Sequence, residues 1–281
     1  MSTSPTDTIV NAFTVDVEDY FQVSAFERHI PRDTWDHQAQ RVEASTDRLL
    51  ATLARHRVVG TFFTLGWVAE RYPQLINRIV AAGHELASHG YDHVRVTQMT
   101  PAMFKADISK TKQILEDLAG VAVVGYRAPT FSFTRDNEWA YPLLAEAGYR
   151  YSSSVAPLRH DLYGIPDAPR HVYQAANGMT EVPLSTIRMR GANYPCGGGG
   201  FFRLYPYAVT KWCVQRVNLR EQQACVFYMH PWEFDPEQPR QKALSFRTRF
   251  RHYLNLDRVQ GRLERLLADF RWDRMDQIFL R

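Results

Sequence analysis

Two histidines separated by three residues are the first candidates for chemistry in this sequence. His89 and His93 lie in the stretch 83–93, among acidic and small polar residues. Imidazole suits zinc and similar divalent metals, and two histidines four apart on one helical turn project from the same face. The spacing alone is more often found for two solvated or helix-capping histidines. An apolar run (79–82) and a strand-like segment (85–87) precede the pair, which therefore lies at a strand end, where α/β proteins usually build their active sites.

Carboxylates follow the first predicted strand in the same way. The apolar segment 9–15 runs directly into Asp16, Glu18 and Asp19. Three carboxylates at the end of a buried strand are costly unless a cation, an arginine or water satisfies them. They could form a solvated acidic loop, but carboxylates also act as metal ligands and general bases. Later predicted strands end in further polar residues, namely Arg127, the serines 152–154 and His230.

Apolar strand patterns alternate with helical patterns about seven times along the chain. The predicted strands cover residues 9–15, 60–66, 85–87, 121–126, 149–154, 181–185 and 224–229, and the predicted helices cover 42–56, 68–82 with a break at Pro73, 100–118, 137–147, 206–217 and 246–270. This order predicts an α/β fold with a parallel sheet. A barrel would gather the polar strand ends at one face, whereas an open sheet would spread them along an edge, and we therefore favour the barrel.

The composition is that of an ordinary globular chain. It has 281 residues, 45% of them apolar and 23% charged, which is enough to bury a sizeable core. The net charge of +4 does not by itself indicate nucleic acid binding. Much of the positive charge lies late in the chain, at Arg240, Lys242, Arg247, Arg249, Arg251, Arg258, Arg262 and Arg265. This region is either a solvated helix face or a weak surface for an acidic polymer or an anionic membrane.

Cysteine usage and hydropathy indicate the compartment. Cys196, Cys213 and Cys225 form no C-x-x-C pair, so a disulfide framework is not expected. Residues 1–8 are predicted to be a disordered lead, because they are polar and lack the basic and apolar segments of a signal peptide. No apolar run approaches the roughly 20 residues of a membrane helix. We therefore expect a cytoplasmic protein without a membrane span.

In order and spacing, these motifs resemble the polysaccharide deacetylases with the NodB homology domain, carbohydrate esterase family 4. The matching stretches are T-V-D-V-E-D at 14–19, the histidine stretch at 83–93, R-A-P-T at 127–130 and Y-M-H-P-W at 228–232. Their variant details are similar to the branch found with exosortase-linked exopolysaccharide loci. The resemblance implies a distorted (β/α)7 TIM-like barrel, with a deacetylase domain over 9–235 and a helical C-terminal extension over 236–281 packed on the barrel.

The resemblance also implies catalytic roles, position by position. Asp16 would be the general base and His230 the general acid. Arg127 would orient the base, and the backbone N–H of Thr130 would help to form an oxyanion hole. The acidic residue that supports the acid histidine elsewhere in the family has no obvious match near 151–153.

A divalent metal, with zinc as the favoured ion, would be held by His89 and His93 and by a carboxylate. The common family motif has two adjacent aspartates, whereas here the residue directly after Asp16 is Val17, and the next carboxylates are Glu18 and Asp19. The third ligand is therefore either Glu18 or Asp19. Strand alternation places Glu18 on the same face as Asp16, which favours Glu18 slightly.

Such a site can hydrolyse an amide. A metal polarises the carbonyl, a carboxylate deprotonates water, and a histidine protonates the leaving amine. We expect removal of N-acetyl groups from N-acetylhexosamine units of an exopolysaccharide or its lipid-linked oligosaccharide precursor, in contact with exopolysaccharide biosynthesis machinery and without nucleic acid. Two alternatives are an allantoinase-like hydrolase of a small cyclic amide and a non-catalytic glycan-binding module. The second would be expected to lose the base, the arginine or the acid histidine, yet all three are present.

Overall fold

A computed structural model describes residues 9–160 and 163–280, so the predicted lead at 1–8 lies outside the described residues. The chain is built around one curled sheet. The strands are β1 (Val10–Val17), β2 (Thr61–Thr64), β3 (Glu85–Ser88), β4 (Gly125–Tyr126), β5 (Tyr151–Ser152), β6 (Tyr173–Gln174), β7 (Thr180–Glu181), β8 (Thr186–Met189), β9 (Ala192–Pro195), β10 (Val226–Met229) and β11 (Arg271–Asp273). β1 is buried almost without alternation, as a parallel strand covered on both faces should be.

The strand order explains why the strand ends meet. It runs β10-β1-β2-β3-β4-β5-β7-β6, and β11 pairs with β1 beside this path. Every pair in this sheet is parallel except β6 with β7. The sheet curls into a half-barrel, so the carboxyl ends of β1, β3, β4 and β10 gather at one face. The predicted α/β fold with a distorted TIM-like barrel is thus confirmed.

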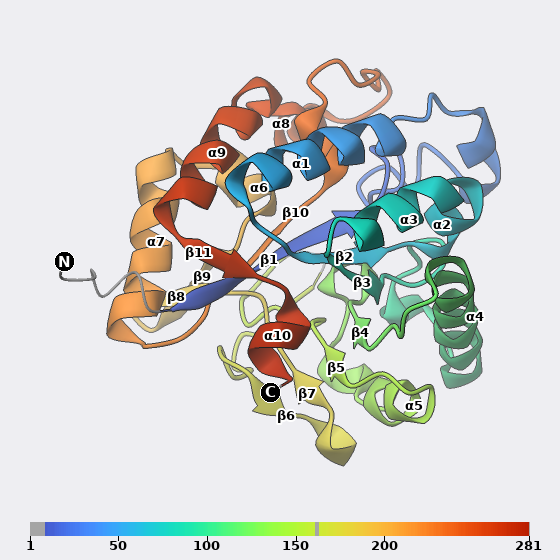
Figure 1. The fold of residues 1–281 in the computed structure, drawn as a ribbon, viewed down its shortest axis with the longest axis horizontal. Helices are drawn as coiled ribbons and strands as arrows, with labels where there is room; N and C mark the ends of the chain where they lie inside the picture. Colours follow the sequence, from blue (N-terminus) through green and yellow to red (C-terminus); the bar gives the residue numbers. More distant parts are fainter. Residues whose placement is uncertain (1–8, 161–162, 281) are drawn as a thin grey trace.

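Helices lie around the outside of the sheet (Figure 1). The α-helices are α1 (Val42–His56), α2 (Gly66–Arg71), α3 (Pro73–Ala81), α4 (Pro101–Ala119), α5 (Ala140–Glu146), α6 (Gly199–Leu204), α7 (Tyr207–Arg220), α8 (Phe246–Tyr253), α9 (Val259–Asp269) and α10 (Met275–Phe279). The 3-10 helices are η2 (Arg32–His37), η3 (Val96–Gln98), η4 (Pro129–Phe131), η5 (Arg135–Asn137), η6 (Ala176–Gly178), η7 (Pro231–Phe234) and η8 (Leu256–Arg258). The predicted break at Pro73 is the boundary between α2 and α3.

The fourth strand is shorter than predicted. The apolar residues 121–126 were expected to be extended, but only Gly125–Tyr126 pairs in the sheet. The Val123 N–H donates to Glu116 Oε1 at 2.8 Å, and Val121 is 39% exposed. The start of this segment therefore closes the carboxyl end of α4 instead of joining the sheet.

A glycine segment fills the gap between β7 and β10. The Tyr228 N–H donates to the Gly197 carbonyl at 2.6 Å, and Gly198 forms an isolated bridge with Tyr228. Gly198 has φ +114°, and a Cβ there would meet the Tyr228 carbonyl oxygen at 2.0 Å. Only glycine can occupy this position, because both the backbone angle and the close approach exclude a side chain.

The end of the sheet opposite the site is closed by the end of the chain. Met275 of α10 is fully buried and packs with Ala12, Phe63 and Val226 from the sheet. The tail, predicted as one helix over 246–270, is interrupted at Asn255, which has φ +52°, and it also supplies the unpredicted strand β11.

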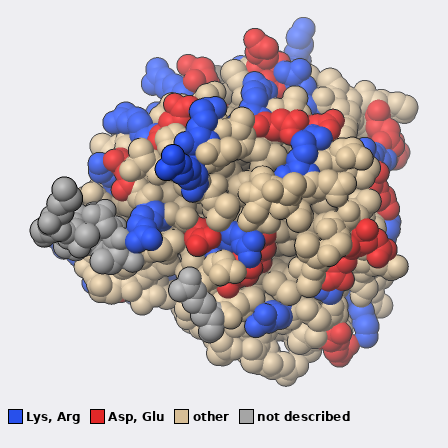
Figure 2. All heavy atoms as spheres, in the orientation of Figure 1, with Lys and Arg blue, Asp and Glu red and all other residues tan. Residues whose placement is uncertain are grey.

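The surface is mixed in charge. On the face shown in Figure 2, basic and acidic side chains are interspersed over a largely uncharged surface. Within residues 9–160 and 163–280, no helix combines the length and apolar character needed to cross a membrane.

Candidate active site

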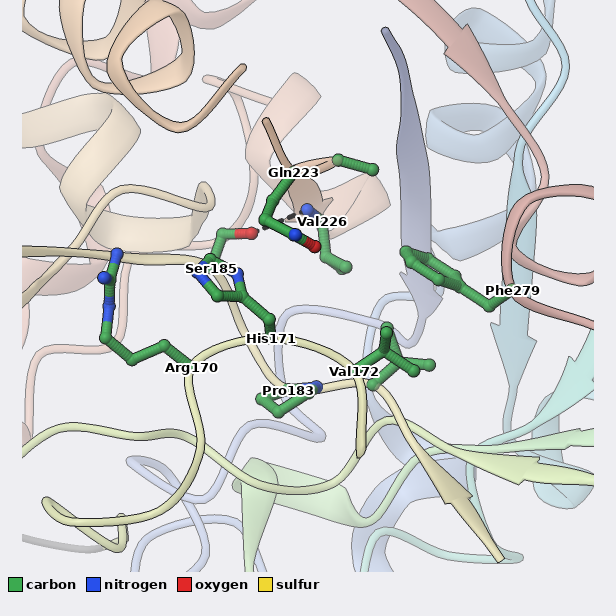
Figure 3. A pocket seen from close by; sticks show the side chains of 10 residues that line it. Arg170, His171, Val172, Pro183, Ser185, Gln223, Val226 and Phe279 are labelled. Carbon is green, nitrogen blue, oxygen red and sulfur yellow. Dashed lines mark hydrogen bonds between the residues drawn. The ribbon is translucent and has the colours of Figure 1, made fainter. Parts of the chain in front are cut away.

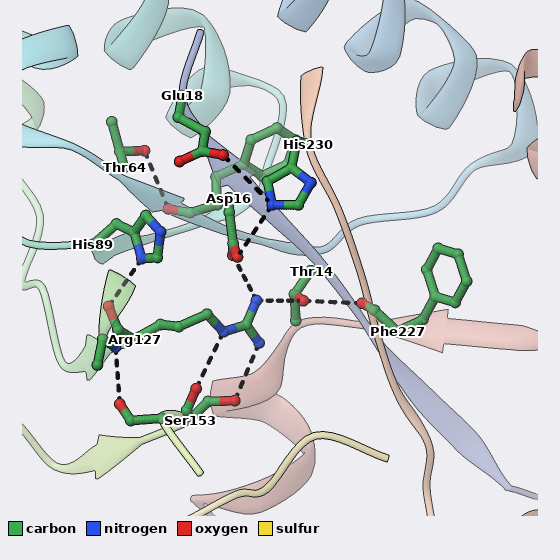
Figure 4. Close-up of polar contacts among 12 residues, drawn as sticks. Thr14, Asp16, Glu18, Thr64, His89, Arg127, Ser153, Phe227 and His230 are labelled. Atoms are coloured by element: carbon green, nitrogen blue, oxygen red, sulfur yellow. Dashed lines mark hydrogen bonds and ion pairs between the residues drawn. The ribbon is translucent and has the colours of Figure 1, made fainter. Parts of the chain in front are cut away.

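The carboxyl end of β1 brings a carboxylate against a buried arginine (Figure 4). Arg127 follows β4 and is fully buried, and its Nη1 donates to Asp16 Oδ1 at 2.6 Å. The remaining N–H groups of Arg127 donate to Thr14 Oγ1 and to the carbonyl and hydroxyl oxygens of Ser153. The guanidinium also lies over the Phe63 ring, 4.0 Å from its centroid. These contacts fix both members of the Asp16–Arg127 pair.

The two histidines approach the same point from a loop rather than from a helix. β3 ends at Ser88, and the chain then turns through Gly90 at φ +74° and reaches His93 at φ +60°. The helical turn expected from the four-residue spacing is therefore not formed. His89 Nδ1 lies 2.9 Å from the Arg127 carbonyl oxygen. A carbonyl can only accept, so Nδ1 carries the proton and Nε2 is left as a ligand atom.

Glu18 faces both histidines and completes a candidate metal centre. Ligand atoms of Glu18, His89 and His93 all lie within 4.8 Å of one another, and all three side chains are buried. Glu18 Oε2 is 2.9 Å from His93 Nε2, yet it has no hydrogen-bond partner among the described residues. A buried carboxylate oxygen without a donor, next to two imidazoles, fits a divalent cation.

The pKa values of His89 and Glu18 favour the protonation states that bind a cation. Burial lowers the pKa of His89 to about 4, so its imidazole is neutral near pH 7. Burial by itself would raise the pKa of Glu18, but nearby imidazoles, His93 first, lower it to about 2. Two properties that metal ligation requires, an ionised carboxylate and a neutral imidazole, are thus present together.

Asp19, the other carboxylate considered as a ligand, is occupied elsewhere. Its Oδ2 accepts from the backbone N–H groups of Arg41 and Val42 at 2.6 and 2.7 Å, and its Oδ1 accepts from that of Tyr20. Asp19 therefore ties the loop after β1 to the start of α1. Of the two carboxylates that the sequence left open, Glu18 is the one that meets the histidines.

Thr130 lies at the wall of the site in a strained conformation. It has φ +58°, and Phe131 follows at φ +49°. Left-handed backbone is rare for a β-branched residue and is found where function or packing imposes it. No backbone hydrogen bond among the described residues uses the Thr130 N–H. Its side-chain hydroxyl lies 2.6 Å from Ser24 Oγ, which anchors the turn.

His230 enters from the opposite side, at the end of β10. Its Nε2 is 3.6 Å from Glu18 Oε1 and 4.0 Å from Asp16 Oδ2. Its Nδ1 lies 2.9 Å from Glu233 Oε1, and Glu233 Oε2 accepts from Arg203 Nε at 2.6 Å. Burial by itself would lower the pKa of His230, but Glu233, Glu18 and Asp16 raise it to about 9. The imidazole is therefore charged at neutral pH and can donate a proton from Nε2.

Glu233 and Arg203 are the functional residues that sequence reasoning missed. Glu233 lies three residues after His230 in H-P-W-E, so a carboxylate following the histidine was the available signal. Arg203 comes from α6 and its Nη1 donates to the His252 carbonyl at 2.6 Å. No local pattern joins residues so far apart in the chain.

A cavity of about 530 Å³ lies at the candidate site. Asp16, Glu18, both histidines, Thr130 and His230 all contribute to its wall, and residues of α6 and α8 form another side. The pocket in Figure 3 is different in kind, since its volume is about 10 Å³, room for about one water molecule. There, Ser185 Oγ accepts from the Val226 N–H at 2.7 Å. The large cavity is therefore the candidate substrate site.

Known proteins resemble this chain in sequence over part of its length. A peptidoglycan deacetylase of Helicobacter pylori is 32% identical over 114 residues, which are 40% of this chain and 38% of that protein. A peptidoglycan-N-acetylglucosamine deacetylase of Bacillus cereus is 37% identical over 84 residues, 30% of each chain. The chain thus spans well under half of the length of these curated relatives.

Solved structures share the fold over nearly the whole chain. A Mycobacterium smegmatis protein assigned as a polysaccharide deacetylase superposes with a TM-score of 0.64 at 23% identity, covering 99% of this chain and 91% of that one. Puue allantoinase superposes with a TM-score of 0.60 at 14% identity, covering 99% and 92%. At these identities the likeness establishes the fold alone.

Two family matches divide the chain. Residues 153–280 match a domain of unknown function, DUF3473. Residues 33–152 match the polysaccharide deacetylase family and contain both histidines and Arg127. The fold and the sequence relatives agree with this match, so residues 33–152 are similar to the polysaccharide deacetylase family.

Proposed function

We propose that the protein is a metal-dependent hydrolase that removes N-acetyl groups from N-acetylhexosamine units of a glycan. One observation carries the proposal: a buried carboxylate–arginine pair, a Glu–His–His group and a charged histidine converge on one cavity. The match of residues 33–152 to the polysaccharide deacetylase family and the relatives named as deacetylases support the same chemistry.

The residues divide the reaction between them. A zinc-like ion bound by Glu18, His89 and His93 would polarise the amide carbonyl and make water more acidic. Asp16, held by Arg127, takes the proton from the attacking water.

Thr130 and His230 would serve the oxyanion and the departing amine. The Thr130 N–H is available to the developing oxyanion, since no other group uses it within the described residues. Nε2 of His230 delivers a proton to the departing amine, while Nδ1 stays bonded to Glu233.

The finer assignment concerns the glycan. We propose an exopolysaccharide or its lipid-linked precursor as substrate, with action on the cytoplasmic side in contact with biosynthetic machinery. Support comes from the sequence motifs, which resemble the exopolysaccharide-linked branch, and from the basic region after residue 239.

A small cyclic amide is the alternative substrate, because the allantoinase fold is also similar. A non-catalytic glycan-binding role is disfavoured by the geometry. A module that only binds glycan has no need of the buried Asp16–Arg127 pair or of a charged His230 aimed at it.

Metal content and product release test the proposal together. We expect about one zinc-like ion per chain in the wild type, measured by elemental analysis, and its loss in His89→Ala, which removes one of three protein ligands. His29→Ala, an exposed histidine outside the site, is the matched control and should keep the ion. The wild type should release acetate from chitooligosaccharides or N-acetylated exopolysaccharide repeats.

Two outcomes would overturn this function. A folded, metal-loaded protein that releases no acetate from N-acetylated glycans, but opens allantoin, would establish the cyclic-amide alternative. A protein that takes up no ion under any loading condition would exclude the metal-dependent mechanism.

A further inference from the structure

A strip of exposed apolar side chains borders the mouth of the large cavity. Phe246 and Phe250 of α8 are 83% and 49% exposed, and Leu204 at the end of α6 is 46% exposed. Phe250 and Leu204 both line the cavity, and the Phe246 and Phe250 rings are stacked with centroids 6.4 Å apart. We call these three residues the α8 strip. It leads outward from the cavity wall, and patches of this kind usually mark an interaction site.

The sequence around α8 is basic. The sequence from 238 to 256 contains Arg240, Lys242, Arg247, Arg249 and Arg251, and no aspartate or glutamate. Lys242 and Arg249 are exposed, and neither forms an ion pair with any residue that the structure describes. An apolar strip edged by basic side chains complements a surface that is apolar beneath an anionic layer.

The geometry favours a bilayer over an acidic glycan as the partner. A sugar platform needs an open aromatic face together with polar side chains that bind hydroxyl groups. Here one face of each phenylalanine ring is turned to the other ring, and the strip itself, made of two phenylalanines and a leucine, offers no side-chain hydrogen-bonding group to a sugar. Phenylalanine and leucine can enter lipid without leaving any polar group unsatisfied.

We propose that helix α8 and Leu204 dock the mouth of the cavity onto an anionic lipid bilayer. The strip enters the interface, while Lys242 and Arg249 contact anionic headgroups. Binding of this kind is peripheral, since it uses one helix face and a few charges. If the proposed deacetylase function holds, docking would place the site next to glycans carried on lipid. The docking itself does not depend on that function.

Vesicle co-sedimentation of the full chain tests the docking. We expect binding to phosphatidylcholine vesicles that contain phosphatidylglycerol, and little binding without it. Phe246→Ser should weaken binding by about tenfold, since the inserted ring contributes roughly the free energy of burying one phenylalanine. Met103→Ser, which removes another strongly exposed apolar side chain, is the control and should bind normally.

Charge is tested separately. Reversal of Lys242 and Arg249 to glutamate should weaken binding on the order of tenfold or more, since two attractions to anionic headgroups are replaced by two repulsions. Reversal of Arg150 and Arg220, which are exposed elsewhere, gives the same net charge and should bind like the wild type.

The result is independent of catalysis. Phe246 does not line the cavity, so Phe246→Ser should release acetate from soluble chitooligosaccharides at the wild-type rate. Absence of binding to the anionic vesicles, or equal loss in the strip and control variants, would overturn the docking. Binding to a soluble acidic polysaccharide such as alginate, without binding to vesicles, would assign the surface to a glycan instead.

Discussion

Glu233 orients His230 and, together with Glu18 and Asp16, favours its charged form. Glu233 Oε1 accepts a hydrogen bond from Nδ1–H of His230, and Glu233 is itself held by Arg203. The imidazole ring stacks on the Trp232 ring, with the two centroids 5.1 Å apart. An acid that must donate from Nε2 works only while the imidazole is protonated. The rate should therefore fall as the pH rises through the pKa of His230, which Glu233 helps to raise to about 9.

Glu233→Gln should move this alkaline limb to lower pH. Removing one negative charge favours the neutral imidazole, and we expect a shift of about one pH unit and a fall in kcat on the order of tenfold. The pH profiles of kcat and kcat/KM for the metal-loaded enzymes measure both effects. Glu237→Gln, at an exposed position nearby, is the control. A variant with an unchanged alkaline limb would show that Glu233 has only a structural role.

Arg127 should matter for stability as well as for activity. Arg127→Met leaves the Asp16 carboxylate buried without its partner, which costs about 3–5 kcal/mol in comparable buried pairs. Arg55→Met breaks an exposed pair with Glu264 and should cost about 0–1 kcal/mol. Urea denaturation of the metal-free proteins gives both values. Similar losses in the two variants would contradict the picture of Arg127 as the buried anchor of the base.

At the scale of elements, β3 is tied to the end of the chain by a buried glutamate. Glu85 Oε2 accepts from Thr61 Oγ1 and from the backbone N–H of Asp276, while Oε1 accepts from the Tyr151 hydroxyl. Burial raises the pKa of Glu85 to about 7 from 4.5. The same strand ends at the loop of the candidate metal ligands, so this anchor supports the position of His89.

The raised pKa predicts a pH-dependent stability. Between about pH 4.5 and 7 the folded state keeps the Glu85 proton and the unfolded state has lost it, so the free energy of unfolding falls as the pH rises. Glu85→Gln mimics the protonated form and should remove this fall, giving a protein more stable than the wild type at pH 8. Denaturation midpoints at pH 5 and 8 measure the difference. A wild type more stable than the variant at pH 8 would show that the ionised carboxylate of Glu85 does not destabilise the fold, which contradicts a raised pKa.

The elements that the sequence predicts best are those whose signals are local. The helix expected over 42–56 is observed with the same bounds, because periodicity and polar ends act within the segment. Polar residues at strand ends were sufficient to locate Asp16, His89 and His230. The Arg203–Glu233 pair and strand β11 could not be predicted, since each arises from contacts between distant segments. The loop form of the histidine pair depends on left-handed residues, which four-residue spacing does not reveal.

At the scale of the whole molecule, three segments must fold together to make one site. Asp16 and Glu18 precede the matched deacetylase region, the histidines and Arg127 lie within it, and His230 and Glu233 lie in the region of unknown function. In Figure 1 the strands that lead to these residues, β1, β3, β4 and β10, belong to the one curled sheet, with β2 between β1 and β3. The second region therefore contributes to the candidate active site rather than standing beside it.

Removal of residues 236–281 tests whether the three segments fold as one cooperative unit. The tail contributes β11 to the ladder on β1, buries Trp272 edge-on against Phe13 at 6.0 Å, and supplies the His252 carbonyl that holds Arg203. Burying a tryptophan alone is typically worth about 3–5 kcal/mol, a large share of the stability of a single domain.

We therefore expect the fragment 1–235 to lack a cooperative unfolding transition, measured by near-ultraviolet circular dichroism in urea, and to bind no metal. Trp272→Ala in the full chain should lower the stability but keep a single transition, because the remaining tail contacts persist. A fragment that unfolds cooperatively and keeps its ion would show instead that residues 236–281 are an extension packed on a barrel able to fold alone. The difference between these results decides whether the tail is part of the catalytic domain.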